Sequence, residues 1–251
     1  MLVFAVCAPD RRGARALSGQ TRLVIFDVDG TLLDNMESEE LCYATALRDG
    51  FGLTALDTDW QTYEHVTDGG VALEAHRRAF GVAPSAERMA HVVDRFVSLL
   101  ADAHSRAPLE QIAGAAGLLT VLPEHGWIPA LATGAWRRAA QFKLAAAGLP
   151  VENIPLATSE DGPARVAIAQ AAWGRAVKGR AAFERVILVG DRPWDAAAAQ
   201  ALRLPFVGRA SSERAEALRS RGATSVVPDF MDLGTVLTAF ETAVVPFSVH
   251  S

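Results

Sequence analysis

The chain has 251 residues, of which 50% are hydrophobic, so it can bury the core of one sizeable domain or of two modest ones. Its net charge is -5 and no run of basic residues is present, which argues against nucleic acid or an anionic membrane as a partner. Two cysteines are too few for a disulfide framework and favour a reducing compartment. No apolar segment reaches the length of a membrane span. We therefore expect a cytoplasmic protein.

The first twenty residues differ from the rest of the chain. Their short apolar run is followed, not preceded, by arginines, which is the reverse of a secretory signal. We interpret residues 1–20 as a tail. A spurious upstream start or an extra ordered strand fits the sequence as well.

Short apolar runs rich in β-branched residues predict six buried strands. They lie at residues 22–27, 127–133, 152–158, 185–190, 204–208 and 224–228, and the run at 152–158 is the weakest. After residue 134, alanine-rich stretches of helical length separate these runs. Such alternation is typical of a parallel sheet covered by helices on both faces, so we expect an α/β fold with a doubly wound parallel sheet.

The segment 35–106 breaks this alternation. It contains no convincing strand, but apolar residues recur at helical spacing at Met89, Val92, Val93, Phe96, Leu99 and Leu100. The segment begins just after the first strand, where a βα loop would lie over the carboxyl edge of the sheet. The sequence thus predicts a helical cap at 35–106, inserted into a core formed by 21–34 and 107–251.

Carboxylates follow two of the predicted strands. Asp27 ends the first strand and Asp29 lies in the loop beyond it, while the strand at 185–190 is followed by Asp191 and then Asp195. If these two strands are neighbours, the carboxylates converge, and they would raise one another's pKa unless a cation neutralised them. Because every candidate ligand is an oxygen, Mg²⁺ fits better than zinc.

The motif "DVDGT" has two other interpretations. Taken alone, it fits a pair of capping or turn aspartates. A calcium loop does not fit, because with Asp27 as its first position the glycine falls too early and Ser38 stands where a glutamate is needed.

A phosphate site is predicted after the strand at 127–133. Thr133 ends that strand, and Gly134 and a helix-forming run come next. A hydroxyl, a flexible residue and a helix N-terminus with free N–H groups can bind a phosphate. Thr133 alone also fits a helix N-cap. The acidic cluster favours the phosphate interpretation, since Mg²⁺ and amide donors serve opposite sides of one anion.

The motifs "DVDGT", "LATG" and "GDRPWD", in this order and with a helical insert after the first, resemble those of the haloacid dehalogenase superfamily of phosphohydrolases. The match covers roughly residues 21–230, and the position of the insert resembles the cap of the subfamily that contains phosphoglycolate phosphatases and β-phosphoglucomutases. The resemblance implies a Rossmann-like core, Asp27 as the nucleophile and Asp29 as the general acid/base. It also implies that Thr133 and Gly134 bind the phosphoryl group and that Mg²⁺ is held by Asp27, Asp29, Asp191 and Asp195.

One feature of the family pattern is missing. The pattern has a lysine near the end of the third strand, where "LATSEDGPARVAIAQAA" offers only Arg165. We favour Arg165 as the cation that binds the phosphate, although a surface arginine fits the sequence too. The alternative is Lys143, which lies about 12 Å further along the helix after Thr133.

The cap stretch "HVTDGGVALEAH", residues 65–76, is the candidate for substrate specificity. Two glycines follow Thr67 and Asp68, which suits a tight turn facing the phosphate site. A simple helix N-cap by Asp68 is the alternative.

Together these features predict a Mg²⁺-dependent phosphatase that acts on a small phosphorylated metabolite as a monomer or homodimer. A phosphomutase of the same fold needs the same residues and stays open. A haloacid dehalogenase is less favoured because it would need neither Asp29 nor a metal site. A non-catalytic binding scaffold is disfavoured by the complete set of carboxylates.

Overall fold

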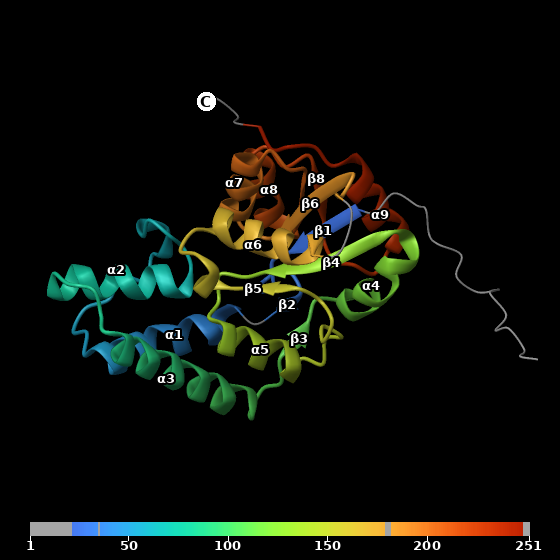
Figure 1. Cartoon of the computed structure of the whole chain (residues 1–251). Helices are drawn as coiled ribbons and strands as arrows, with labels where there is room; N and C mark the ends of the chain where they lie inside the picture. The colour runs from blue at the N-terminus through green and yellow to red at the C-terminus, as the bar shows by residue number, and fades with distance from the viewer. Residues whose placement is uncertain (1–21, 35, 179–181, 248–251) are drawn as a thin grey trace, which may run out of the picture.

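The computed structural model describes residues 22–34, 36–178 and 182–247, so the predicted tail at 1–20 lies outside the described residues. The core is a parallel sheet with strand order β5-β4-β1-β6-β7-β8, which confirms the predicted fold class (Figure 1). The strands are β1 (Arg22–Phe26), β4 (Trp127–Ala132), β5 (Leu156–Ala157), β6 (Arg185–Gly190), β7 (Phe206–Arg209) and β8 (Ser225–Val227).

Strand β1 lies in the middle of the sheet and is buried on both faces. Leu23 and Ile25 belong to the hydrophobic cluster on one face, and Val24 and Phe26 belong to the cluster on the other. This alternation follows from the two-residue period of a strand, and burial on both sides explains why the run is apolar throughout. The strand is therefore held from both sides up to the residue that precedes Asp27.

Helices cover both faces of the sheet, as Figure 1 shows. One face packs against α6 (Arg165–Val177), α7 (Pro193–Leu202) and α8 (Ser212–Ser220). The other packs against α4 (Ala115–Val121), α5 (Arg137–Ala146) and α9 (Leu233–Thr242). Short 3-10 helices lie at Trp60–Thr62, Leu122–His125 and Ser159–Asp161.

The predicted helical segment contains α1 (Met36–Phe51), α2 (Asp68–Phe80) and α3 (Ala86–His104), which lie together beside the sheet (Figure 1). Val92, Phe96 and Leu100 of α3 are buried in a third hydrophobic cluster, so the helical periodicity is confirmed. That cluster also includes Trp136 and Ala139, which belong to the core. The cap is therefore packed onto the core through α5.

A small antiparallel pair was not predicted. Strand β2 (Leu33–Asp34) pairs with β3 (Glu110–Gln111), and the Ile112 amide donates to the Leu32 carbonyl at 2.9 Å. The two ends of the helical segment are thereby joined at the edge of the core. Two-residue strands are too short to produce a period-two pattern in the sequence.

The division into separate domains at residues 34 and 107 stays a prediction.

The weakest predicted strand is shorter than expected. The run at 152–158 forms a strand only at Leu156–Ala157, on the edge of the sheet. Pro155 lacks an N–H group, which limits pairing on that side, although its carbonyl accepts from the Leu131 amide at 2.7 Å.

Within the described residues, the helices fall short of the combined length and apolarity that a membrane span requires.

Candidate active site

The first and third motifs meet because their strands are neighbours. Strands β1 and β6 pair in parallel with Phe26 opposite Val189, and the Asp27 amide donates to the Val189 carbonyl at 2.9 Å. Asp27 and Asp191 therefore leave the sheet at the same edge, as predicted.

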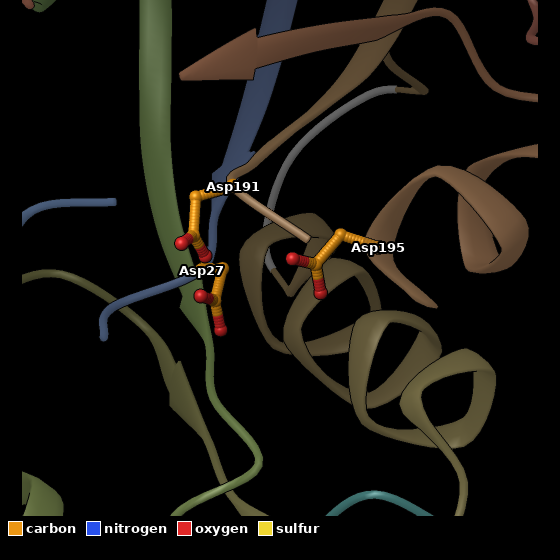
Figure 2. Close-up of side chains that lie close together, drawn as sticks. All are labelled: Asp27, Asp191 and Asp195. Carbon is orange, nitrogen blue, oxygen red and sulfur yellow. The ribbon is translucent and has the colours of Figure 1, made fainter. Parts of the chain in front are cut away.

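Three buried carboxylates converge at this edge. One oxygen from each of Asp27, Asp191 and Asp195 lies within 4.8 Å of the others, and Figure 2 shows the three side chains grouped beyond the strand ends. Burial, followed by repulsion from neighbouring carboxylates, raises the pKa of Asp27 and of Asp191 to about 7. Burial likewise raises the pKa of Asp195 to about 6, against the lowering effect of Arg165. The site thus holds more negative charge than the protein neutralises.

Two glycines make room for these carboxylates. A Cβ atom added to Gly190 would lie 2.5 Å from the Cβ of Asp195, and one added to Gly30 would lie 2.2 Å from Asp191 Oδ2. Gly30 also has a φ of +79°, which L side chains rarely adopt. The glycine in "DVDGT" is therefore required both by the turn and by the neighbouring motif.

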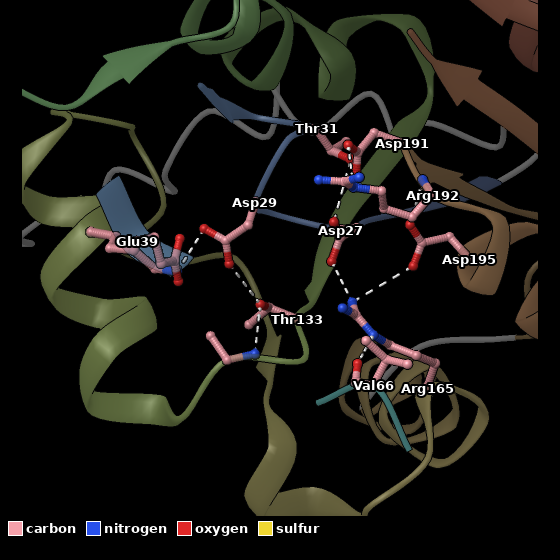
Figure 3. Close-up of polar contacts among 12 residues, drawn as sticks. Asp27, Asp29, Thr31, Glu39, Val66, Thr133, Arg165, Asp191, Arg192 and Asp195 are labelled. Carbon is pink, nitrogen blue, oxygen red and sulfur yellow. Dashed lines mark hydrogen bonds and ion pairs between the residues drawn. The ribbon is translucent and has the colours of Figure 1, made fainter. Parts of the chain in front are cut away.

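Arg165 is the cation beside the acidic cluster. Its Nη1 lies 2.8 Å from Asp27 Oδ1 and 3.6 Å from Asp195 Oδ1, and its Nε donates to the Val66 carbonyl at 3.2 Å (Figure 3). Arg165 is the first residue of α6. It also contacts the phosphate motif, because a Cβ on Gly134 would lie 2.7 Å from its guanidinium. Arg165 therefore joins Asp27, Asp195 and Gly134 in one place.

Asp29 is separated from the three-carboxylate group. Its Oδ1 accepts from Lys143 Nζ at 2.6 Å, and Thr133 Oγ1 donates to its Oδ2 at 3.4 Å. In Figure 3 its carboxylate points toward Thr133 and Glu39 while Asp27 points toward Arg165. The structure does not bring the Asp29 side chain to the predicted metal site, but it places this carboxyl beside the phosphate motif.

Lys143 reaches the site, contrary to the predicted separation of about 12 Å. Helix α5 begins at Arg137 rather than at Gly134, and side chains on a helix point back toward its N-terminus. Lys143 is fully buried and forms ion pairs with both Asp29 and Glu39. Burial alone would lower the pKa of Lys143, but these two carboxylates raise it above its ordinary value.

Glu39 is a site residue that sequence reasoning missed. It lies on α1 of the cap, and burial together with the charge of Asp29 raises its pKa to about 8. A glutamate in an amphipathic cap helix looks like a surface residue in sequence, so no local signal identifies it.

The phosphate motif differs from its predicted form. Thr133 Oγ1 accepts from the Ala135 amide at 3.0 Å, so Thr133 stabilises a turn and is not the N-cap of α5. The first amides of α5 are also not free. The Trp136 amide donates to Asp68 Oδ2 at 2.9 Å, and the Arg137 amide donates to Glu160. Two carboxylates thus occupy the donors that the sequence assigned to a phosphate.

The cap turn at Thr67 and Asp68 touches the core. Thr67 is the N-cap of α2, because its Oγ1 accepts from the Gly70 amide at 3.1 Å. The same oxygen donates to the Pro163 carbonyl of the core at 3.0 Å. The alternative in which Asp68 is the cap is therefore wrong. The Asp68 amide donates to the Gly134 carbonyl at 2.8 Å, so the turn does face the phosphate motif. Its role in specificity stays a prediction.

A cavity of about 110 Å³ lies between the cap and the core. Its core side includes Asp29, Gly134, Ala135, Arg165 and Trp194, and its cap side includes Glu39, Glu40, Tyr43, Trp60, Val66, Thr67, Asp68 and Val71. The acid/base candidate and the phosphate motif therefore open into a space that the cap closes.

The family model for haloacid dehalogenase-like hydrolases matches residues 21–203. The chain belongs to this family. A search of curated proteins gave no match. The resemblance inferred from the three motifs is thus confirmed, and the candidate active site belongs to a hydrolase.

Solved structures share the fold of this haloacid dehalogenase-like hydrolase. A hydrolase from Pseudomonas syringae is 22% identical, with a TM-score of 0.62 and coverage of 88% of this chain and 98% of that one. CbbY from Rhodobacter sphaeroides, solved with phosphate, is 21% identical, with a TM-score of 0.64 and coverage of 87% and 98%. A Bacteroides vulgatus protein named as a β-phosphoglucomutase is 17% identical, with a TM-score of 0.64 and coverage of 89% and 91%. At these identities the likeness establishes the fold alone.

Gly30→Ala should abolish activity because the new Cβ would push the Asp191 carboxylate out of place. Gly52→Ala is the matched control, since Gly52 also has a positive φ, of +69°, but no atom of the described residues lies within 4 Å of its Cβ position. Both variants should lose about 1 kcal/mol of stability from backbone strain, and Gly30→Ala should lose more because of its overlap with Asp191; denaturant unfolding measures both losses. Full activity in Gly30→Ala would show that Asp191 need not occupy its present position.

Arg165→Met and Lys143→Met should distinguish the roles of the two cations near the site. Arg165→Met removes the charge beside Asp27 and should lower kcat by about 10²-fold or more, as the loss of a preorganised donor does. Lys143→Met leaves Asp29 and Glu39 facing each other without a cation, and should destabilise the protein by about 3 kcal/mol. Steady-state kinetics and thermal unfolding measure the two effects. A larger loss of kcat at stable fold in Lys143→Met would make Lys143 the phosphate-binding cation.

Proposed function

We propose that this protein is a Mg²⁺-dependent phosphatase that hydrolyses a small phosphorylated metabolite through an aspartyl-phosphate on Asp27. The observation that carries the proposal is the placement of Asp27 beside two different sets of partners. The carboxylates of Asp191 and Asp195 lie beside it, and Arg165 contacts both Asp27 and Asp195 and also touches Gly134 of the phosphate motif. A phosphoryl group beside Asp27 would therefore meet a metal site and a fixed cation together.

The residues present fit a divalent cation. Both oxygens of Asp191 are buried without a hydrogen-bond donor among the described residues, although Arg192 Nε lies 3.2 Å from Oδ2. Buried carboxylate oxygens that lack donors are costly unless a cation coordinates them. Asp27, Asp191 and Asp195 would hold Mg²⁺, a hard cation that prefers oxygen ligands. When bound, it would neutralise charge on the transferred phosphoryl group.

The chemistry of the chain's own residues follows from their positions. An Asp27 carboxylate oxygen attacks phosphorus, forming an aspartyl-phosphate as the bond to the leaving oxygen breaks. Asp29, beside Thr133 and open to the cavity, donates a proton to the leaving alcohol. It then takes a proton from a water that attacks the phosphorus, which releases phosphate and restores Asp27. Arg165 stabilises the negative charge throughout.

The complete set of site residues favours a phosphatase over the other candidates. A haloacid dehalogenase would have no use for three converging carboxylates or for Asp29. A phosphomutase uses the same residues, and a comparison protein carries the name β-phosphoglucomutase, so the products must be examined. Cytoplasmic location, a small-molecule partner, and a monomer or homodimer form part of the same proposal.

Phosphate esters should be hydrolysed in the presence of Mg²⁺ and not after treatment with a chelator. Release of free phosphate with loss of the ester identifies a phosphatase, whereas an isomerised ester without free phosphate identifies a phosphomutase. Asp27→Asn should keep the fold and lower turnover to background, because an amide is not a nucleophile. Retention of more than a small fraction of activity in Asp27→Asn would exclude the aspartyl-phosphate mechanism.

Metal binding has a readout that does not depend on activity. Mg²⁺ should raise the Tm of the wild-type protein because the ion binds the folded state, and this gain should be much smaller in Asp191→Asn. The gain should also shrink at pH 5.5, since carboxyls with a pKa raised to about 6 or 7 are then protonated and compete with the ion. Equal gains in Tm for the two proteins would remove Asp191 from the metal site.

A further inference from the structure

The cavity between cap and core defines where the leaving alcohol must lie. Asp29 and Gly134 line it on the core side together with Arg165, which contacts Asp27, and the cap residues Tyr43, Trp60 and Val71 line it on the other side. Because Asp29 serves the leaving oxygen, the rest of the alcohol extends from Asp29 toward these cap residues. The chemistry of this wall therefore selects the alcohol.

The wall is rich in carboxylates and poor in cations. Glu39, Glu40 and Asp68 line it together with Asp29. Among the lining residues in the described part of the chain, Arg165 supplies the positive charge, and it is already paired with Asp27. Lys143 lies behind the wall and is shared by two of the carboxylates. A second anionic group on the substrate would thus meet several carboxylates. Within the described lining, the only cation it would meet already has a partner.

Two acids of the wall, Glu39 and Asp68, have raised pKa values, chiefly because they are buried. Burial, followed by the charge of Asp29, raises the pKa of Glu39 to about 8. Burial also raises the pKa of Asp68 to about 7, despite the opposing effects of Lys143 and the Trp136 amide. Asp27, Asp191 and Asp195 do not line this cavity, so the predicted metal site lies beside it, and Arg165 contacts both the cavity and Asp27. A positive group inside the cavity would stabilise the ionised forms of these acids.

Aromatic rings complete the wall. Trp60 and Tyr43 pack with their ring centroids 5.6 Å apart, and the Tyr43 hydroxyl donates to the Asp68 carbonyl at 2.6 Å, which fixes the ring. Trp194 lines the opposite side of the cavity. Aromatic faces beside carboxylates attract organic cations, because the ring quadrupole and the negative charges act in the same direction.

We propose that the substrate is a small phosphate monoester whose alcohol carries a positively charged amine, held by Glu40 and Asp68 and by the ring of Trp60. This inference rests on the proposed phosphatase function and narrows it. A cavity of about 110 Å³ suits an alcohol with a few heavy atoms beyond the ester oxygen. Aminoalkyl phosphates satisfy the size, the charge and the aromatic contact together.

Three esters of nearly equal size test the charge preference. Aminoethyl phosphate, propyl phosphate and phosphoglycolate place an ammonium nitrogen, a methyl carbon and the carboxylate oxygens, respectively, three bonds from the ester oxygen. We expect kcat/KM with Mg²⁺ to fall in that order, by about tenfold between the cation and the methyl group, as one cation–π contact and a nearby carboxylate predict. Phosphoglycolate equal to or better than aminoethyl phosphate would overturn the inference.

Variants of the cavity residues then show which side chains produce the preference for the amine. Glu40→Gln should raise the KM for aminoethyl phosphate several-fold and leave propyl phosphate unchanged, and Trp60→Leu should do the same if its Tm stays close to wild type. Glu87→Gln is the matched control, since it removes the same charge from α3 of the cap, away from the cavity. An equal effect of Glu40→Gln on all three esters contradicts the assignment. Hydrolysis of none of the esters with any divalent metal would instead reject the phosphatase function itself.

Discussion

The burial of three carboxylates at one edge of a parallel sheet is the constraint on which the rest of the site depends. Asp27, Asp191 and Asp195 are buried and repel one another, and both effects raise their pKa values. The apolar strands β1 and β6 hold Asp27 and Asp191 in place. Gly30 and Gly190 lack a Cβ atom and so leave room for the side chains of Asp191 and Asp195. The fold is stable enough elsewhere to keep an unfavourable cluster ready for a cation.

The cap is tied to the core by charge as well as by apolar packing. Lys143 on α5 joins Asp29 of the core to Glu39 of the cap, and Asp68 of the cap accepts from the Trp136 amide at the start of α5. Both contacts meet on one core helix, beside the phosphate motif. A change in the position of the cap would therefore alter the surroundings of Asp29 directly, since the same lysine holds both carboxylates.

The elements that could be predicted are those with a repeating pattern or a fixed neighbour in sequence. The apolar runs predicted the strands, and strand adjacency then brought Asp27 to Asp191 and Asp195. Glu39 was missed and Lys143 was placed too far from the site, because their positions depend on how α1 docks and on where α5 begins, and tertiary contacts set both. The amides of α5 were misassigned for the same reason: Asp68 and Glu160 come from distant parts of the chain. The β2 and β3 pair has too few residues to leave a pattern.

Asp27 and Asp29 have different surroundings because a turn separates them. The Val28 carbonyl accepts from the amides of Thr31, Leu32 and Leu33, which bends the chain back immediately after the strand. Asp27 stays in line with β1 and meets Arg165 and the other two carboxylates, while Asp29 leaves in another direction and meets Lys143 and Thr133. Two side chains of the same chemistry, two residues apart, thereby acquire different partners. In the function that we propose, Asp27 attacks phosphorus and Asp29 serves the oxygen that departs, because environment rather than residue type assigns the roles of paired carboxylates.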